Sequence, residues 1–376
     1  MYYHIVLTER CNLKCKYCYE KSMKEFENGL EKKWTYDDKA PFDSAVKGEN
    51  LKNFLVDGDT LIFYGGEPLI MIDKIEEIIK SLDGKNIRYY IQTNGILLNK
   101  LPDEILKKIS KILVSIDGDK EIDGFNKGKI HYDMAVRNIK ILRERGFRGE
   151  IVARMVMAPP YCFDVKKQVL HLVKLIKEGL FDSIHWQIDA GFYKNDFDFD
   201  SFSDYVKKYN TSVQELVTWW LSELQEGRVW KIYPFFGILA RIKKWDTETR
   251  LPCGAGYANF TINTYGKISA CPIMNSVENF YCGSVEEGPN KLREIKIVDE
   301  KCRSCSYFDI CGGRCLYWRS AKLWPPEGDE LICKTIKNII DSIREITPKI
   351  DLLLKNQTLK EEDFSFEKYF GPEIIP

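Results

Sequence analysis

Residues 11–18 read CNLKCKYC, and they place Cys11, Cys15 and Cys18 in a CxxxCxxC pattern. The pattern directly follows a β-branched and aromatic stretch at residues 3–7, which predicts a first strand that ends in a cysteine loop. Three thiolates in so short a loop can bind three irons of a [4Fe–4S] cluster, which leaves the fourth iron open to a small molecule. The spacing also allows a three-cysteine zinc site with water or a distant fourth ligand.

The composition of the chain limits the classes of protein to consider. The 376 residues include 56 basic and 56 acidic side chains, a balance that argues against a dedicated nucleic-acid binder. No uncharged apolar run approaches the roughly 18 residues of a membrane helix, and no signal peptide is visible. We therefore expect a cytoplasmic protein without membrane contact. Because the cytosol keeps thiols reduced, the twelve cysteines indicate metal binding or thiol chemistry rather than disulfides.

Strand-like and helical stretches alternate in the first half of the chain. Strands are predicted at residues 3–7, 60–64, 88–92, 112–116, 151–157 and 183–188, and helices at 70–82, 101–109, 134–145 and 165–178. This alternation predicts an α/β fold, a partial (β/α)6 barrel of the TIM type with a parallel sheet inside a layer of helices. In such folds the chemistry lies at the carboxyl ends of the strands.

Polar residues and glycines follow most of these predicted strands. They are Gly65, Gly66 and Glu67 after the second strand, Thr93 and Asn94 after the third, Ser115 and Asp117 at the fourth, and Asp189 after the sixth. Such residues also make ordinary turns, so each one alone is a weak signal. Their gathering at one sheet edge, with the cysteine loop, is what a single active site would produce.

The cysteine loop, with Tyr17 before its last cysteine, and the segment Gly65-Gly66-Glu67-Pro68 resemble the radical SAM superfamily. The resemblance implies that the three cysteines hold a [4Fe–4S] cluster whose open iron binds S-adenosylmethionine. An electron from the reduced cluster would cleave this molecule to methionine and a 5′-deoxyadenosyl radical, which abstracts hydrogen from a substrate. The cofactor supplies the reactive group, and the protein positions it.

The resemblance also implies contacts with S-adenosylmethionine. Tyr17 would lie near the adenine, and Gly65 and Gly66 would expose backbone to the methionine amino group, where Glu67 would accept a hydrogen bond if it does not do so in its own loop. Ser115 would contact the ribose or the carboxylate, and Arg154 on the fifth strand would pair with the carboxylate. Thr93 and Asn94 are further candidates. Asp117 is a contact or, because Asp-Gly is a common turn, a structural residue.

The last third of the chain holds a second set of cysteines. A predicted hairpin at residues 257–270 turns at residues 263–266, and a helix is predicted at 335–354. The set runs Cys253, Gly266, Cys271, Cys302-x2-Cys305-x5-Cys311-x3-Cys315 and Cys333. This order resembles the SPASM domain, which follows the radical SAM barrel in peptide- and protein-modifying enzymes. Pairs of the CxxC type also suit zinc, so two zinc sites are the alternative.

The SPASM resemblance implies two auxiliary [4Fe–4S] clusters and therefore three clusters in all. The first would take Cys253, Cys271 and Cys315, and the second Cys302, Cys305, Cys311 and Cys333. We hypothesise that Cys282 is the fourth ligand of the first cluster; the alternative is a small buried residue. Cys162 stands alone and is interpreted as structural. The predicted domains are a barrel at 1–200, a helical bridge at 201–250, a SPASM domain at 251–340, and a helix and tail at 341–376.

The resemblance favours a peptide- or protein-modifying enzyme that forms a crosslink, epimerises a residue or oxidises one. Sulfatase-maturing enzymes, which make formylglycine, carry an aspartate after the second SPASM cysteine, where this chain has Pro272. A reaction on a tetrapyrrole or another small molecule would also fit, as would a non-enzymatic zinc- or cluster-stabilised interaction module. Asp189 is the candidate for substrate contact and catalysis. Expected partners are a flavodoxin or ferredoxin and, because ten residues precede Cys11, a separate leader-binding protein.

Overall fold

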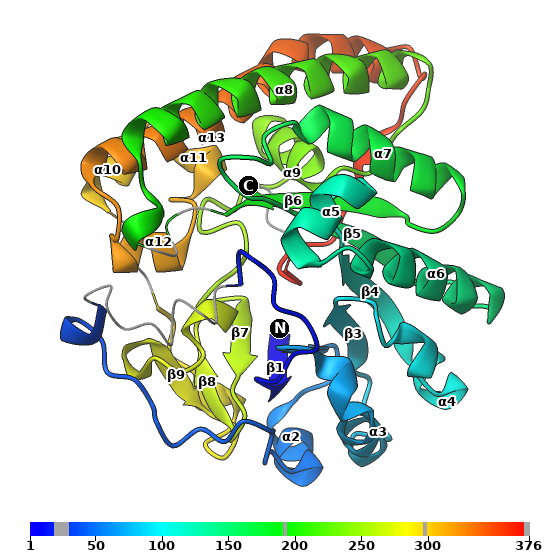
Figure 1. Ribbon diagram of the computed structural model, residues 1–376, viewed down its shortest axis with the longest axis vertical. Coiled ribbons are helices and arrows are strands. Elements are labelled where there is room, and N and C mark those ends of the chain that lie inside the picture. The colour runs from blue at the N-terminus through cyan, green and yellow to red at the C-terminus, as the bar shows by residue number, and fades with distance from the viewer. Residues whose placement is uncertain (19–29, 190, 192–193, 296–298, 372–376) are drawn as a thin grey trace. The chain divides into compact units, whose positions relative to one another are not determined.

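The computed structural model describes residues 1–18, 30–189, 191, 194–295 and 299–371 (Figure 1). The chain groups into two compact units, each of which is considered by itself. Unit 1 comprises residues 1–116, 123–153 and 254–296, and unit 2 comprises residues 117–122, 154–253 and 297–376. Within the described ranges, every helix is too short or too polar to span a membrane.

Unit 1 is built on a mostly parallel sheet. Its strands are β1 (Tyr2–Thr8), β2 (Thr60–Gly65), β3 (Arg88–Thr93), β4 (Ile109–Ser115), β7 (Asn259–Ile262), β8 (Lys267–Ser269) and β9 (Tyr281–Ser284). The strand order is β4-β3-β2-β1-β7-β8-β9, and β5 (Glu150–Met157) and β6 (Ser183–Ile188) follow β4 along the chain. All pairings from β4 to β7 are parallel, which confirms the predicted α/β arrangement.

The helices of unit 1 follow the strands that the sequence pattern predicted. They are α2 (Gly48–Phe54), α3 (Ile72–Ser81), α4 (Asp103–Leu106), the end of α5 (Lys120–Lys127) and α6 (His131–Glu144). In α3 the side chains of Ile75, Ile78 and Ile79 recur at helical spacing and are buried. Their burial removes apolar surface from water and fixes the helix on the sheet. Parallel strands need such crossovers, so each strand ends at the same edge of the sheet.

The hairpin of β7 and β8 adds to the edge of the parallel sheet. Its antiparallel pairing, Thr261 with Ser269, confirms the hairpin that the sequence predicted. The sequence did not predict that β7 also pairs in parallel with β1. A buried hydrogen bond of 2.9 Å between His4 Nδ1 and Asn259 Oδ1 joins the two strands. One sheet thereby carries both the first cysteine loop and the hairpin that precedes Cys271.

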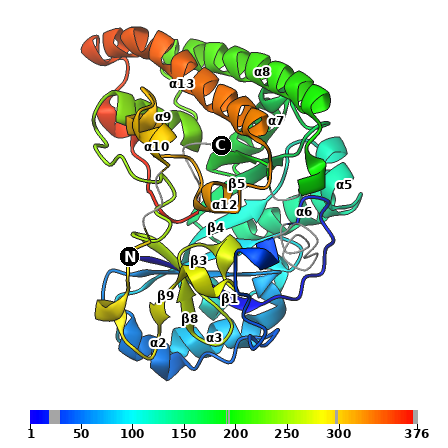
Figure 2. The ribbon, with the colours of Figure 1, turned by 90° about the vertical axis from the view of Figure 1, so that its left-hand side faces the viewer.

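Unit 2 is dominated by two long helices. It contains α7 (Val165–Lys177), β6, α8 (Phe199–Gln225), α9 (Tyr233–Ile242), α10 (Glu300–Arg303), α11 (Phe308–Cys311), α12 (Leu316–Ala321) and α13 (Pro326–Lys355). Helix α13 packs along α8, as both views show (Figures 1 and 2). The Gln214 amide of α8 donates to Asn338 Oδ1 of α13 at 2.8 Å.

Two predicted helices have different bounds in the structure. The helix expected at 101–109 is only α4, because Ile109 already pairs with Tyr89 in the sheet and the backbone bonds of β4 replace those of a helix. The helix expected at 335–354 begins earlier, at Pro326, where proline suits the first helical position. Cys333 therefore lies on α13 rather than before it.

Candidate active site and cysteine pocket

The first cysteine loop begins where β1 ends, at the carboxyl edge of the parallel strands. Cys11 is exposed, and Cys15 and Cys18 are half-buried. The loop folds tightly, because the Leu13 amide donates to Cys11 Sγ at 3.4 Å and the Cys18 amide donates to the Cys15 carbonyl at 3.2 Å. The thiols of a compact, accessible loop suit a cluster that must also admit a small ligand. The donor set fits the predicted group.

Gly65 and Gly66 hold the start of this loop. The Gly66 amide donates to the Thr8 carbonyl at 2.8 Å, and the next amide donates to the Arg10 carbonyl at 2.9 Å. A Cβ on Gly66 would lie 2.4 Å from the Arg10 carbonyl oxygen, and one on Gly65 would lie 2.3 Å from that of Thr8. The missing side chains therefore let two backbones touch within the protein. This close approach is a second reason for glycine here, beside the ligand contact that the sequence resemblance implies.

Glu67 is fully buried and joins the second and third strand ends. Its carboxylate accepts from the Thr93 hydroxyl at 2.7 Å, the Asn94 amide at 2.8 Å and the Leu69 amide at 3.0 Å. Burial raises the pKa of this carboxyl to about 7, although the three hydrogen bonds favour the charged form. Of the two roles predicted for Glu67, the structure shows the one within the loop.

Asn94 connects this carboxylate to the cysteine loop. Its side-chain amide donates to Asn12 Oδ1 at 2.7 Å, between the first two cysteines. Its carbonyl lies 2.8 Å from His131 Nε2, and His131 Nδ1 lies 2.5 Å from the Asp123 carboxylate. Asp123 also pairs with Lys127 at 3.0 Å, and all three of these ionisable side chains are almost completely buried.

The helix end that carries Asp123 and Lys127 touches the cysteine loop directly. The Lys16 amide donates to the Asn126 carbonyl at 3.0 Å. The Lys127 ammonium lies 5.4 Å from the centre of the Tyr17 ring, whose side chain is half-buried. Sequence reasoning missed Asp123, Lys127 and His131, although Asp123 and Lys127 stand four residues apart, the spacing of neighbours on one helical face.

The remaining predicted contacts follow β4, β5 and β6. Ser115 is the half-buried last residue of β4. Asp117 is buried and accepts from the Val156 amide at 2.9 Å, which is the structural role considered for it. Arg154 is half-buried on β5 and donates to Gln187 Oε1 at 2.7 Å.

Asp189 directly follows β6, and its backbone amide donates to the Met157 carbonyl at 3.2 Å. Its side chain is half-buried. Burial, with smaller contributions from Asp196 and Asp117, raises the pKa of its carboxyl to about 7. A carboxyl with such a pKa can both give and take a proton near neutral pH.

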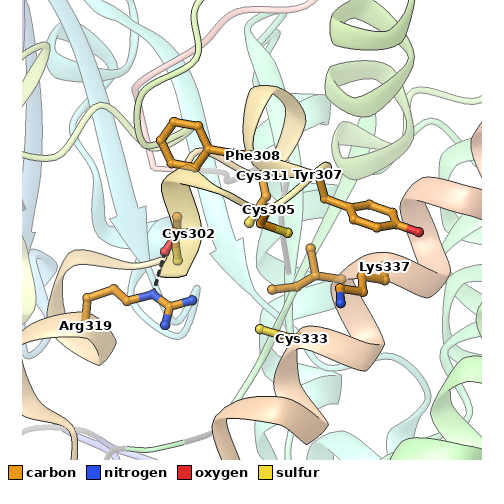
Figure 3. A pocket seen from close by; sticks show the side chains of 10 residues that line it. Cys302, Cys305, Tyr307, Phe308, Cys311, Arg319, Cys333 and Lys337 are labelled. Atoms are coloured by element: carbon orange, nitrogen blue, oxygen red, sulfur yellow. Dashed lines mark hydrogen bonds between the residues drawn. The ribbon is translucent and has the colours of Figure 1, made fainter. Parts of the chain in front are cut away.

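Four cysteines of unit 2 line one pocket of about 40 Å³ (Figure 3). They are Cys302 on α10, Cys305 in the turn after it, Cys311 at the end of α11 and Cys333 on α13. These are the residues predicted for the second auxiliary cluster. Burial raises the pKa of the Cys302 thiol and raises that of Cys311 to about 11. The positive charge of Arg319 opposes both shifts without cancelling them.

The chain around Cys311, in the wall of this pocket, is held by contacts to backbone carbonyls. Arg241, buried on α9, donates to the Ile310 carbonyl at 2.8 Å and the Arg250 carbonyl at 3.2 Å. Gly312 follows Cys311 with a φ of 64°, and a Cβ there would lie 2.3 Å from the Arg250 carbonyl oxygen. Glycine is therefore required where the chain turns from α11 toward Cys315.

The remaining cysteines are divided between the two units. Cys253 and Cys315 belong to unit 2, whereas Cys271 and Cys282 belong to unit 1, so the first auxiliary set stays a prediction. Cys282 is buried in β9, and burial raises the pKa of its thiol to about 12. Cys162 is buried, with its Sγ 3.7 Å from the Met157 sulfur.

The comparison with known protein families agrees with this geometry. The model of the radical SAM superfamily matches residues 5–173, the span that holds the cysteine loop, Glu67 and Asn94. The chain contains a radical SAM domain. The described fold, with the cysteine-rich C-terminal region, is similar to that of native anSMEcpe with bound AdoMet and the Kp18Cys peptide: the TM-score is 0.67 at 18% identity, over 93% of this chain and 99% of that one.

Three further comparisons describe the relatives of this radical SAM domain. A cysteine-type anaerobic sulfatase-maturating enzyme of Clostridium perfringens is 24% identical over 342 residues, which are 83% of this chain and 87% of the relative. Fe-coproporphyrin III synthase of Methanosarcina barkeri is 35% identical over 149 residues, 38% of this chain and 34% of the relative. Streptococcus suis SuiB bound to the precursor peptide SuiA gives a TM-score of 0.52 at 15% identity, over 84% of this chain and 71% of that one.

Proposed function

We propose that this radical SAM enzyme modifies a peptide or protein with the help of two auxiliary [4Fe–4S] clusters. The observation that carries the proposal is the second cysteine group: Cys302, Cys305, Cys311 and Cys333, separated by up to 31 residues, line one pocket. Support for a peptide substrate comes from relatives that share the fold, since anSMEcpe and SuiB were both solved with bound peptides. The modification would be a crosslink, an epimerisation or an oxidation.

The pocket favours an iron–sulfur cluster over zinc. Among the described residues, no three His, Cys, Asp or Glu side chains are grouped closely enough to hold a single metal ion. One zinc ion needs its thiolates at about 2.3 Å from a common centre. In a [4Fe–4S] cluster each thiolate binds a different iron, so the ligands stand further apart around a larger group. Four cysteines around one pocket, without a tight metal-ion group, fit the cluster.

Roles in the radical SAM domain follow from the contacts within it. Cys11, Cys15 and Cys18 would hold the cluster that, with S-adenosylmethionine bound, supplies the 5′-deoxyadenosyl radical. Glu67 and Asn94 would position the cysteine loop, because their hydrogen bonds lead to Asn12. Tyr17, Gly65, Gly66, Thr93, Ser115, Asp117 and Arg154 are the remaining proposed contacts with S-adenosylmethionine.

Asp189 is the proposed acid–base residue. Pro272 opens the short 3-10 turn after Cys271 and cannot accept a proton, so the aspartate of sulfatase-maturing enzymes has no counterpart there. Asp189 stands at the carboxyl end of β6, where barrel enzymes place their catalytic groups. With a pKa near neutrality, it can take a proton from an oxidised substrate. Asp189→Asn should abolish peptide product while uncoupled cleavage of S-adenosylmethionine continues.

The first auxiliary cluster would be held by Cys253, Cys271 and Cys315, with Cys282 as fourth ligand. Cys282→Ala tests the last assignment: it should lower the iron content and change the auxiliary spectrum. Full iron content with an unchanged spectrum would assign Cys282 to the interior of β9 instead. A flavodoxin or ferredoxin as electron donor, a separate leader-binding protein and a cytoplasmic location complete the proposal.

Iron and acid-labile sulfide per chain, measured after anaerobic reconstitution, test the function most directly. Three [4Fe–4S] clusters require about twelve of each. A value near four, with zinc present, would overturn the auxiliary clusters and remove the main support for a peptide substrate.

Sulfatase maturation is the second candidate, favoured by the similarity to the Clostridium perfringens enzyme over most of both chains. A cysteine-containing sulfatase peptide, incubated with reductant and S-adenosylmethionine, distinguishes it. Formylglycine in the mass spectrum of the peptide would establish this reaction, and 5′-deoxyadenosine without peptide product would argue against it.

A further inference from the structure

Arg319 stands in the wall of the four-cysteine pocket. It lies on α12, four residues after Cys315, and lines the pocket together with Cys302, Cys305, Cys311 and Cys333 (Figure 3). Its side chain is only 8% exposed. A buried guanidinium keeps its charge at every physiological pH, so a fixed positive charge lies beside the four thiols.

Two neighbours fix the orientation of this guanidinium. On one side its Nε donates to the Gly313 carbonyl at 3.2 Å, within the turn that follows Cys311. On the other side one terminal nitrogen lies 3.1 Å from both oxygens of Asp329, at the start of α13. The Trp318 indole donates to the same carboxylate at 2.6 Å and holds it in place. The charge cannot swing out into solvent without breaking these bonds.

The second cation of the pocket differs in its exposure. Lys337 also lines the pocket, but its side chain is exposed, and its ammonium lies 5.5 Å from the centre of the Tyr307 ring. Water and salt screen the charge of Lys337, whereas the buried charge of Arg319 acts through protein. Asp329 opposes Arg319, yet its carboxylate is 22% exposed and is therefore better solvated.

An electron that enters a cluster held by four thiolates adds negative charge to a site that is already negative. A fixed positive charge nearby stabilises the reduced form more than the oxidised form, and charge and hydrogen bonding around the sulfurs are known determinants of cluster potentials. We propose that Arg319 raises the reduction potential of the cluster in this pocket, so that this cluster accepts an electron more readily than it would without the Arg319 charge. This inference rests on the proposed function, because it requires a cluster there.

The test is a redox titration of the reconstituted full-length chain, followed by electron paramagnetic resonance. The signal lost in Cys333→Ala identifies the cluster of this pocket. Arg319→Gln should lower its midpoint potential, so that the reduced-to-oxidised ratio at a fixed potential falls about tenfold, a shift of about 59 mV for one electron. Asp329→Asn should shift the potential upward. Lys337→Gln, the matched control, should shift it less than Arg319→Gln.

The two charge changes of opposite sign separate electrostatics from structure. If both variants acted only by breaking the Arg319–Asp329 contact, the midpoint potential would shift in the same direction in Arg319→Gln and Asp329→Asn. That result, or an unshifted potential in Arg319→Gln, would overturn the inference. Arg319→Lys keeps the positive charge without the planar guanidinium group, and its midpoint potential should stay near that of wild type. This variant keeps the test decisive if Arg319→Gln does not fold. A wild-type chain with zinc and no auxiliary signal would overturn the proposed function itself, and the inference with it.

Discussion

The cysteine loop of unit 1 and the cysteine pocket of unit 2 hold their thiols in opposite ways. The loop takes Cys11, Cys15 and Cys18 from eight consecutive residues, leaves Cys11 exposed and is held from outside by backbone and amide hydrogen bonds. The pocket takes its four cysteines from three helices and a turn, keeps each of them half-buried and adds a buried arginine.

The difference teaches what each site can do. Three ligands in an accessible loop leave a coordination position for a small molecule, as S-adenosylmethionine chemistry requires. Four ligands drawn from three helices and a turn would close the coordination sphere, so the proposed cluster there could store or pass electrons but would have no free protein-side position. The pocket also ties α10, α11 and α13 together, and metal binding there should contribute to folding. The loop should contribute little to folding.

The largest expected effect comes from the loop. Replacing Cys11, Cys15 and Cys18 together by alanine should abolish cleavage of S-adenosylmethionine, because no thiolate remains to hold its cluster. About four of about twelve irons should be lost, while thermal unfolding shifts little. Iron analysis, product chromatography and calorimetry check this. Retained 5′-deoxyadenosine formation would mean that the loop is not the site of cleavage.

Cys333→Ala should reverse that pattern. Loss of the α13 ligand, one of the four proposed, should release the pocket's proposed cluster and lower the thermal midpoint of the chain, because metal binding there would contribute to folding. Cleavage of S-adenosylmethionine with a chemical reductant should continue, whereas peptide product should fall. The same assays as for the loop variant apply. An unchanged melting curve would contradict the view that this pocket is the structural site of the two.

Glu67 offers a test of how the loop is held, through the pH dependence of stability. Burial raises its pKa from the ordinary 4.5 to about 7, so the folded state binds this proton more tightly than the unfolded chain does. The resulting stabilisation is present below pH 4.5 and is lost as the pH rises through 7, with a total of about 3 kcal/mol. The hydrogen bonds from Asn94, Thr93 and Leu69 oppose this shift of the pKa.

Glu67→Gln removes this titration. The free energy of unfolding of the variant, relative to wild type, should therefore rise between pH 5 and pH 8 by about 2–3 kcal/mol, as measured by denaturant titration. Glu77→Gln is the matched control, since Glu77 is half-exposed and paired with Lys74 on the surface of α3. Equal pH profiles for the two variants would show that Glu67 is not the group responsible.

The sequence predicted most strands, and it grouped the cysteines of the loop and three of the four pocket cysteines, because these features are local. The cysteine spacing in residues 11–18 and 302–311 is encoded within a few residues, and so are the alternations that mark β1 to β6. The parallel pairing of β7 with β1 depends on segments about 250 residues apart, and no local pattern specifies it. His131 contacts the Asn94 carbonyl, which lies 37 residues earlier in the chain, and Arg319 lines a pocket with Cys302, Cys305, Cys311 and Cys333, so these roles became visible only in the structure.

Replacement of Cys162 should have the smallest effect of these variants and serves as the control for the other cysteine substitutions. It is buried with its Sγ 3.7 Å from the Met157 sulfur, and we interpret its thiol as a packing element. Cys162→Ala should cost about 1 kcal/mol of unfolding free energy, the usual result of removing one buried heavy atom. Iron content, the auxiliary signals and 5′-deoxyadenosine formation should match wild type. A loss of iron here would give Cys162 a ligand role and would overturn its interpretation as a structural residue.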